Sequence, residues 1–348
     1  MRKLTLCLVV IAIFQFSSLI DLYGQQAVTF QKKTNEQKVD VLIGGKFFTS
    51  YTYTNNIEKP VLYPLQTASG ILVTRGFPIN PRPNERTDHP HHIGMWFNYG
   101  DVSGLDFWNN SYAIPDSAKY KYGSIKHQQI VATKDGKNNG SLSVTANWID
   151  IKGKVLLKEQ TTFVFSGDAT HRIIDRTTTL TAQQEKVSMK DNKEGILGIR
   201  VTRELEIPAD KPEIFTDAQG IPTKVAVLNN EGVTGNFLTS EGKTGNDAWG
   251  TRGKWCLIYG RKSNQDVSIA IIDHPGNPGY PTYWHARGYG LFAANNLGQE
   301  ALSAGKDKLN FSLEQGKSAT FKYRIVITNG STPSAQQLDK MAANFSKL

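Results

Sequence analysis

The chain has 348 residues, and 40 lysines and arginines against 31 aspartates and glutamates set its formal charge at +9 at pH 7. The positive charges are scattered, which argues against a nucleic-acid-binding tract. The only cysteines are Cys7 and Cys256, so a disulfide scaffold is excluded and a hydrophobic core must supply the stability.

Residues 1–24 are predicted to be a secretory signal peptide. Arg2 and Lys3 form a basic start, and the apolar run that follows is short for a membrane span. Cys7 stands at the start of this run, whereas a lipoprotein cysteine would follow it, so no lipid anchor is expected. We therefore expect residues 25–348 to be a single large β domain in the periplasm or outside the cell, with no membrane span after signal cleavage.

Short strands separated by glycine, asparagine, aspartate and proline dominate residues 25–348. Alternation is clearest at 141–151, where Leu142, Val144 and Trp148 oppose polar residues, as on a strand with one wet face. In chain order, the predicted strands are Ile71–Thr74, Ile93–Tyr99, Ser141–Ile151, Thr161–Phe165, His171–Thr181, Ile196–Arg203, Lys224–Leu228, Trp255–Tyr259, Val267–Asp273 and Thr320–Thr328. The fold class expected is all-β, a large antiparallel β-sandwich.

One helix is predicted, at the end of the chain. Thr332 can cap it and Pro333 fits its first turn. The apolar residues that share one of its faces are Leu338, Met341, Ala342 and Phe345. We expect this short helix to dock on the sandwich.

Two segments, 80–110 and 273–292, hold five of the seven histidines together with clustered aromatic, arginine and proline residues. The triplet Asp-His-Pro occurs in both, at 88–90 and at 273–275. Loops on a rigid scaffold often carry catalytic residues. Side chains of these types suit a polyhydroxylated ligand, because its ring faces stack on aromatics and its hydroxyls need donors and acceptors. A single site requires that the two segments meet in space.

A strand entered after Pro90 would divide the first segment into two faces. One face would carry His92, Gly94, Trp96 and Asn98, and the other would carry His91, Ile93, Met95 and Phe97. The second set is expected to be buried. This assigns His92 and Trp96 to the ligand, with Gly94 leaving room for a substrate, and makes His91 a structural residue, unless a bulge at 89–91 reverses the faces.

Histidines and carboxylates are the candidate acid–base groups. We expect His92 and His285 to exchange protons with a sugar, and Asp88 or Glu194 to orient a histidine or to act directly. A turn with a solvated ion pair is the alternative for Glu194. The other candidate carboxylates are Asp273 and two residues beside glycine-rich turns, for which Asx turns are expected: Asp101 and Asp106.

Guanidinium groups and aromatic rings are the expected substrate-binding groups. The residues assigned to this role are Arg86, Trp96, Asn98, Tyr283, Trp284 and Arg287. Among Arg82, Arg86 and Arg287 we expect one to contact the ligand and the others to brace loops. The aromatic residues of the second segment are either stacking platforms or an apolar plug between sheets: Tyr280, Tyr283, Trp284 and Tyr289.

No cofactor is required by the sequence, but the histidines could instead bind a divalent metal. His89 and His91 flank one residue, and His285 could close a three-nitrogen site. The sequence contains neither HExxH nor the His-x-His followed closely by Glu of jelly-roll metal sites. A metal site at these three histidines is therefore an alternative to metal-free catalysis.

Three stretches resemble the PmoA-like family, often labelled methane oxygenase PmoA: LYPLQTASGILVTRGFPINPRPNERTDHPHHIGMWFNYGDVSGLDFWNN, KEGILGIRVTREL and NPGYPTYWHARGYGLFAANNLG. The resemblance implies an exported, β-rich bacterial protein that acts in carbohydrate breakdown. The predicted sandwich is similar to the mutarotase-type supersandwich. A membrane oxygenase subunit would need several spanning helices, whereas no apolar run of about 18 residues follows the signal.

The sequence thus favours an exported carbohydrate-active enzyme, a hydrolase, lyase or epimerase that acts on a glycoside or modified sugar. A non-catalytic carbohydrate-binding protein would use the same aromatics and arginines, but it would tolerate the loss of each histidine. A metal-dependent oxidase is the third possibility. No nucleic-acid partner is expected.

Overall fold

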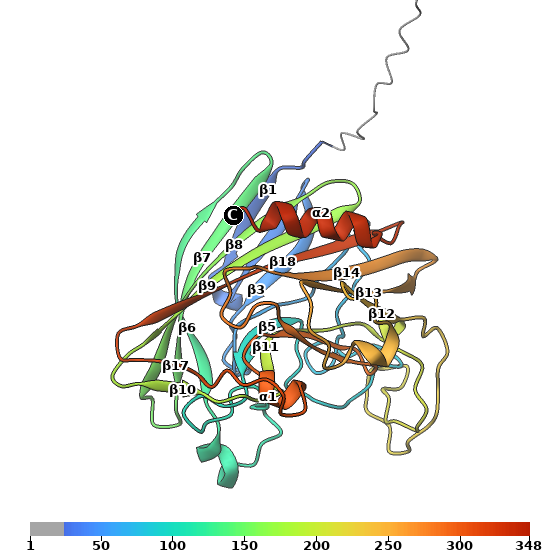
Figure 1. Cartoon of the computed structure of the whole chain (residues 1–348). Coiled ribbons are helices and arrows are strands. Elements are labelled where there is room, and N and C mark those ends of the chain that lie inside the picture. The colour runs from blue at the N-terminus through green and yellow to red at the C-terminus, as the bar shows by residue number, and fades with distance from the viewer. Residues whose placement is uncertain (1–23) are drawn as a thin grey trace, which may run out of the picture.

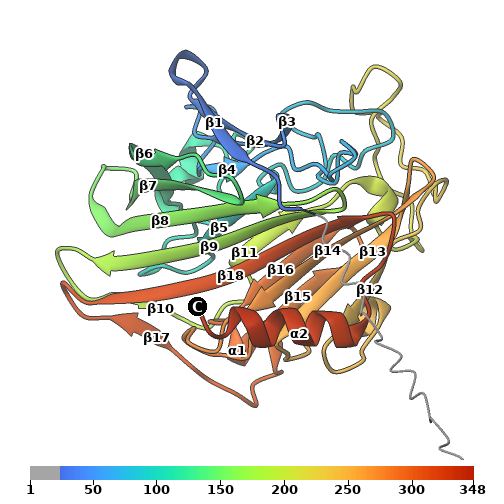
Figure 2. The same ribbon diagram turned by 90° about the horizontal axis from the view of Figure 1, so that it is seen from above.

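The structure is a computed structural model that describes residues 24–348. Residues 1–23 of the signal peptide expected at residues 1–24 lie outside the described residues. Two large antiparallel sheets pack face to face, as Figures 1 and 2 show, and the all-β sandwich predicted from the alternation is confirmed.

The two sheets have eight strands each. The first sheet has the order β1 (Val28–Lys33), β2 (Lys38–Ile43), β3 (Lys46–Thr52), β4 (Val61–Leu62), β5 (Met95–Tyr99), β11 (Gly195–Arg200), β16 (Leu291–Asn295) and β15 (Tyr283–Arg287). The second has the order β12 (Asn236–Thr239), β13 (Trp255–Lys262), β14 (Gln265–Asp273), β18 (Ser318–Asn329), β9 (His171–Ala182), β8 (Val155–Gly167), β7 (Asn139–Ile149) and β6 (Ser124–Lys134). A small ribbon pairs β10 (Val187–Met189) with β17 (Phe311–Leu313). Because the chain passes between the two sheets several times, strands that are distant in sequence share one core.

Short helices occupy the connections. The 3-10 turns are η1 (Thr34–Glu36), η2 (Asp116–Lys121), η3 (Arg203–Leu205) and η4 (Gly245–Ala248), and the α-helices are α1 (Gln299–Leu302) and α2 (Ala335–Phe345). None of the helices that the structure describes is long and apolar enough to cross a membrane.

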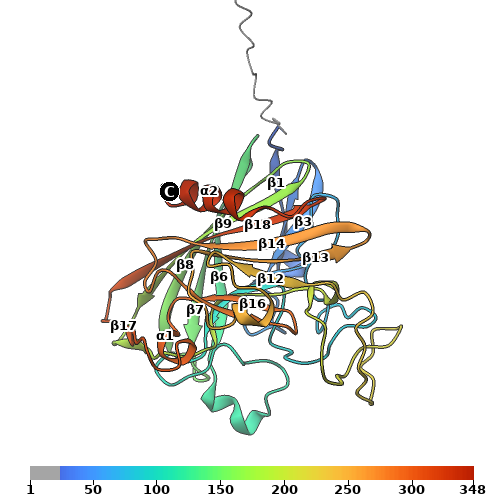
Figure 3. The same cartoon turned by 45° about the vertical axis from the view of Figure 1, so that its right-hand side comes forward.

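Helix α2 docks on the outer face of the second sheet, as predicted. Leu338 and Phe345 are buried against residues of β13, β14 and β18, with Met341 beside them, and Figures 1 and 3 show the helix lying over these strands. The predicted cap was wrong by two residues. Ser334, not Thr332, caps the helix, because its hydroxyl accepts from Gln337 N while Gln337 Oε1 accepts from Ser334 N.

Two of the predicted strands are not strands. Ile71–Thr74 forms single bridges, one of them between Thr74 and Val201, and Lys224–Leu228 forms one bridge, between Val227 and Glu213. Residues 221–228 are all exposed, so their apolar character does not reflect burial. The strands β1–β4, β6, β10, β12 and β15–β17 were not predicted.

The alternation along β5 separates the core from a second cluster. Met95, Phe97 and Tyr99 belong to the core between the sheets, whereas Trp96 belongs to a cluster on the outer face of the first sheet with Trp108 and other buried residues. The predicted division of faces is therefore confirmed from Met95 onward. The connection between β4 and β5, residues 63–94, and the segment after β5 cover this outer face.

Candidate functional site

One row of side chains crosses four strands on the outer face of the first sheet. Trp96 of β5 pairs with Gly198 of β11, which pairs with Ala293 of β16, and Ala293 pairs with His285 of β15. Directly paired residues of antiparallel strands lie on the same face. The small residues in the middle leave space for Trp108, whose ring centroid lies 5.1 Å from that of Trp96 and 6.4 Å from that of His285.

The two segments singled out from the sequence therefore meet. Besides the contact between Trp108 and His285, His89 of the first segment stacks on Tyr289 of the second, with ring centroids 4.9 Å apart and planes 9° apart. The arrangement satisfies the geometric condition for a single site built from residues 80–110 and 273–292.

Asp88 is held by two buried arginines that the sequence did not single out. Arg75 Nη1 donates to its Oδ1 at 2.8 Å, and Arg200 Nη2 donates to the same atom at 2.6 Å. Burial by itself would raise the pKa of Asp88, but Arg200, His89 and Arg75 together hold this pKa well below its usual range. The carboxylate is therefore ionised at neutral pH.

His89 completes a carboxylate–imidazole pair with Asp88. Its Nδ1 lies 2.5 Å from Asp88 Oδ2, and because an ionised carboxylate only accepts, Nδ1 carries a hydrogen, so that the basic nitrogen of the ring is Nε2. The side chain of His89 is 40% exposed. The sequence had suggested His89 as a metal ligand only, although the Asp-His-Pro triplet was the signal that could have revealed this pair.

His92 has a different role from the one expected. Arg200 Nη1 lies 3.3 Å from His92 Nδ1, and since a guanidinium group has no acceptor, Nδ1 accepts and Nε2 carries the hydrogen. Burial, reinforced by His91 and Arg200, lowers the pKa of His92 well below its usual range. The expected proton-exchanging role is corrected to that of a neutral hydrogen-bond donor.

The space expected at Gly94 is also absent. A Cβ on Gly94 would lie 2.3 Å from the carbonyl oxygen of Leu62, and its φ is +56°. The absence of a side chain at Gly94 therefore makes room for the backbone of Leu62 and not for a substrate. Strand β5 begins at Met95, so His92 reaches the site from a turn and not from the strand.

Glu194 lies near His285 but is not hydrogen-bonded to it. Glu194 Oε2 lies 3.7 Å from His285 Nδ1, and Lys193 is paired with the same carboxylate, so the ion pair considered for Glu194 is present. Burial, with Arg287 and Lys193, lowers the pKa of His285 to about 3, which keeps its ring neutral.

Tyr289 lies against His89 and Arg200. Its partly exposed ring stacks on His89, and the guanidinium of Arg200 lies 4.9 Å from its centroid. Burial raises the pKa of its phenol to about 12, and the charges of Glu194 and Asp88 act in the same direction, against Arg200 and Arg287.

Arg82 and Arg86 are loop braces. Arg86 Nε donates to Glu206 Oε2 at 2.7 Å, and its Nη1 lies 2.7 Å from Glu213 Oε1, while Arg82 is paired with Glu85. The expected contact of Arg86 with substrate is corrected, because its guanidinium is engaged by carboxylates. Arg287 is the candidate that remains among the three: its Nε has no partner in the described structure.

Four residues assigned to substrate binding are engaged by the protein itself. Trp284 lies in the core between the sheets, Trp96 is fully buried, Asn98 Nδ2 donates to Phe107 O at 2.6 Å, and Tyr283 Oη donates to Asp307 Oδ2 at 2.6 Å. The expectation that a sugar stacks directly on either tryptophan was wrong, since neither indole is exposed.

The second Asp-His-Pro triplet is structural. Asp273 accepts from Asn277 Nδ2, Asn296 Nδ2 and Thr282 N, and burial raises its pKa to about 7. His274 packs edge-on against Phe345 of α2. At the two aspartates for which Asx turns were expected, the side chains make loop hydrogen bonds three residues on: Asp101 accepts from Gly104 N, and Asp106 accepts from Asn109 N, both at 2.9 Å.

Lys59 is a further residue of the site that the sequence did not suggest. Its Nζ donates to His91 O at 2.8 Å and lies 5.6 Å from the ring centroid of Trp96. Burial lowers the pKa of Lys59 to about 7, although Glu58 and Asp106 raise it. A buried amine with this titration range is typical of functional sites.

The histidines do not form a metal-ligand set. Within residues 24–348, no three His, Cys, Asp or Glu side chains are grouped so that they could hold a metal ion. His89, His91 and His285, the possible ligands suggested by the sequence, are therefore not gathered around one point.

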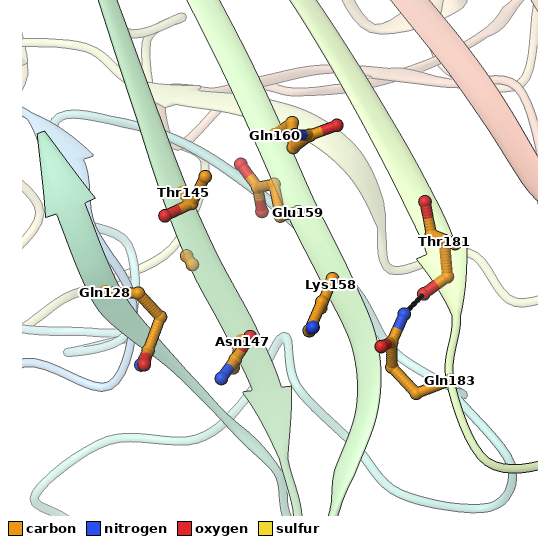
Figure 4. Close-up of a pocket in the computed structure, with 9 residues that line it drawn as sticks. Gln128, Thr145, Asn147, Lys158, Glu159, Gln160, Thr181 and Gln183 are labelled. Carbon is orange, nitrogen blue, oxygen red and sulfur yellow. Dashed lines mark hydrogen bonds between the residues drawn. The ribbon is translucent and has the colours of Figure 1, made fainter. Parts of the chain in front are cut away.

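The largest cavity described lies away from this chemistry. A trough of about 640 Å³ runs over the outer face of the second sheet, and Figure 4 shows the polar side chains that line it. They include Gln128, Thr145, Asn147, Lys158, Gln160, Thr181 and Gln183. Its lining contains no histidine or aromatic ring, as expected for the solvated face of a sheet.

The chain matches the model of a family of unknown function, DUF6807, over residues 38–343, and it belongs to that family. No curated protein matches it in sequence.

Among solved structures, similarity is found to the GH36 alpha-galactosidase AgaA from Geobacillus stearothermophilus, with 8% identity, coverage of 89% of this chain and 41% of that chain, and a TM-score of 0.40. HI1317 is 10% identical, with coverage of 87% of this chain and 99% of that chain and a TM-score of 0.27. Slr1438 from Synechocystis sp. PCC 6803 is 10% identical, with coverage of 88% of this chain and 96% of that chain and a TM-score of 0.29. The chain thus corresponds to less than half of the galactosidase, and similarity at this level assigns no activity.

Proposed function

We propose that this member of the DUF6807 family is an exported carbohydrate-active enzyme that moves protons on a glycoside or modified sugar, as a hydrolase, lyase or epimerase. The observation that carries the proposal is the pair of Asp88 and His89. It combines an exposed imidazole with an ionised carboxylate 2.5 Å from its Nδ1, the arrangement by which proteins orient a general base.

In the proposed reaction, His89 Nε2 accepts a proton from the substrate. Asp88 holds the ring in the required tautomer and stabilises the imidazolium that forms. Arg75 and Arg200 keep the pKa of Asp88 low, so the proton stays on the imidazole. Because Nε2 is the free nitrogen of a partly exposed ring, a substrate can approach it from solvent.

Glu194 is proposed as the second acid–base group. It lies near His285, and its charge raises the pKa of Tyr289, as the charge of Asp88 also does. A reaction at a sugar carbon commonly needs one group that removes a proton and another that delivers one. We place the sugar beside Tyr289, whose ring is partly exposed and stacks on His89.

Export and the wider role rest on the sequence. The basic start and the apolar run of residues 1–24 support secretion. The resemblance to the PmoA-like family supports a role in carbohydrate breakdown. Both stay predictions.

Turnover assays with matched histidine variants test the proposal. The wild-type protein would be screened against glycosides, uronides and keto sugars for reducing-end release, unsaturated products and exchange of C–H hydrogens with D₂O. His89→Ala is expected to lower turnover by roughly 10²–10⁴-fold. His274→Ala is the control, because it alters the same triplet at its structural position and should leave turnover unchanged.

The other outcomes separate the alternatives. Sugar binding without turnover in the wild type, unaffected by His89→Ala, would identify a non-catalytic carbohydrate-binding protein. Stoichiometric copper, iron or zinc after purification, with activity lost on chelation, would favour a metal-dependent oxidase. Full turnover in His89→Ala would exclude His89 as the acid–base group.

A further inference from the structure

The inner part of the site contains three buried N–H groups without partners. They belong to Trp96 Nε1, Trp108 Nε1 and His92 Nε2, each with no hydrogen-bond partner in the structure. Their rings form a compact triangle: the centroid of His92 lies 5.0 Å from that of Trp96 and 5.8 Å from that of Trp108, and the two indoles are 5.1 Å apart. Buried polar groups are rarely left unpaired, and these three donors belong to rings that contact one another.

All three groups are donors. An indole nitrogen only donates, and His92 Nε2 must donate because Nδ1 of the same ring accepts from Arg200. Each unpaired buried donor carries a desolvation cost that no hydrogen bond offsets. A partner for these donors must therefore be an acceptor, and a hydroxyl is a poor match because it brings a hydrogen of its own.

The charges around these donors favour an anion. Lys59 Nζ lies 5.6 Å from the Trp96 centroid, and Arg75 and Arg200 are buried beside His92, with Asp88 as the carboxylate that they share. The negative charges of Glu58 and Asp106 raise the pKa of Lys59 and so favour its charged form. An acceptor that carries negative charge would add charge-assisted hydrogen bonds to this environment.

The size of the group is limited by burial. Trp96, Trp108 and His92 are at most 1% exposed, and His89, which stacks on His92 at 4.9 Å, is the exposed residue next to them. A sugar ring at His89 and Tyr289 can therefore direct only a substituent inward.

We propose that these donors bind a carboxylate of the substrate, so that the protein acts on a sugar acid such as a uronate rather than on a neutral sugar. This inference rests on the proposed function, because it places the sugar ring at His89. A carboxylate is small and planar, carries no hydrogen of its own, and offers lone pairs enough for three N–H groups.

Calorimetric titration with matched ligands tests the inference. D-glucuronate, D-galacturonate and D-mannuronate would each be compared with the parent neutral sugar and with the uncharged methyl ester, and glucose 6-phosphate would represent a phosphate anion. At least one uronate is expected to bind roughly tenfold or more tightly than its parent and its ester. Equal or weaker binding of every uronate, or tighter binding of the phosphate, would overturn the carboxylate assignment.

Tryptophan variants locate the preference. Trp96→Phe removes one of the donors and is expected to reduce the preference for the uronate by roughly ten- to a hundredfold. Trp284→Phe is the matched control: its indole is equally buried, also has an unpartnered Nε1, and lies on the opposite face of the same sheet. It should keep the full preference.

Two substitutions of His92 keep the inference testable if a tryptophan variant folds poorly. His92→Gln can retain an N–H near the position of Nε2, whereas His92→Leu cannot, so the first should preserve more of the preference than the second. An unchanged preference in Trp96→Phe and in His92→Leu would mean that the donors hold ordered water only, and it would overturn the inference. A uronate preference without turnover of any sugar would instead remove the proposed function and leave the carboxylate site.

Discussion

Trp284 and His285 are consecutive residues of β15 that face opposite sides of the first sheet. Trp284 packs in the core, with its ring centroid 6.2 Å from that of Phe292. His285 lies on the outer face beside Trp108. Successive side chains of a strand point in opposite directions, so only one of the two could belong to the site. The expectation that His285 would exchange protons with a sugar positioned by Trp284 therefore conflicted with the strand itself.

This relationship predicts different effects for the two residues. Trp284→Ala should lower the free energy of unfolding by about 3–5 kcal/mol, because it leaves a large cavity in the core, while ligand affinity of the folded fraction stays unchanged. His285→Ala should have the smaller effect on stability and the larger effect on turnover. Denaturant unfolding together with the turnover assay checks this, and the reverse order would contradict the assignment of faces.

Acid titration should reveal the ion pairs of Asp88. Its pKa in the folded protein lies well below the usual 3.8, so its contribution to stability is present above that value and is lost as the pH falls through the lower folded pKa. Asp88→Asn should be less stable than the wild type at pH 7, and the difference should shrink below about pH 4. Thermal unfolding across this range measures it; a constant difference would show that Asp88 acts through hydrogen bonds alone.

Lys59 should make stability rise with pH in the alkaline range. Burial lowers its pKa from 10.5 to about 7, so below about pH 7 both the folded and the unfolded states carry the charge, and the folded state bears the full cost of burying it. Between about pH 7 and 10.5 the folded state loses the proton first, and this cost is relieved. Lys59→Met should abolish this rise in unfolding free energy between about pH 7 and pH 9. Lys137→Met, at an exposed lysine, is the control and should retain the rise.

Gly198 should be intolerant of a methyl group. A Cβ there would lie 2.5 Å from Trp96 Cζ2 and 3.0 Å from Trp108 Cη2, so both indoles would have to move. Gly198→Ala is expected to cost about 1–3 kcal/mol of stability and to alter the near-UV circular dichroism of the tryptophans. A wild-type spectrum in this variant would show that the two indoles do not pack on Gly198.

Local patterns were sufficient to predict much of the scaffold. The alternation of faces from Met95 to Phe97, the loop hydrogen bonds of Asp101 and Asp106, and the apolar face of the C-terminal helix all depend on residues a few positions apart. Such patterns are visible in a sequence because the periods of strands and helices repeat within a few residues. The sequence also singled out the two segments that meet.

Only the tertiary structure decided which groups can do chemistry. Asp88 and Asp273 begin identical triplets, yet Asp88 is held by Arg75 and Arg200, whereas Asp273 is held by neutral amides. Arg200 is 112 residues from Asp88 in the chain, and no periodic pattern connects them. Protonation and orientation depend on such partners, and these partners become neighbours only when the strands pair into a sheet.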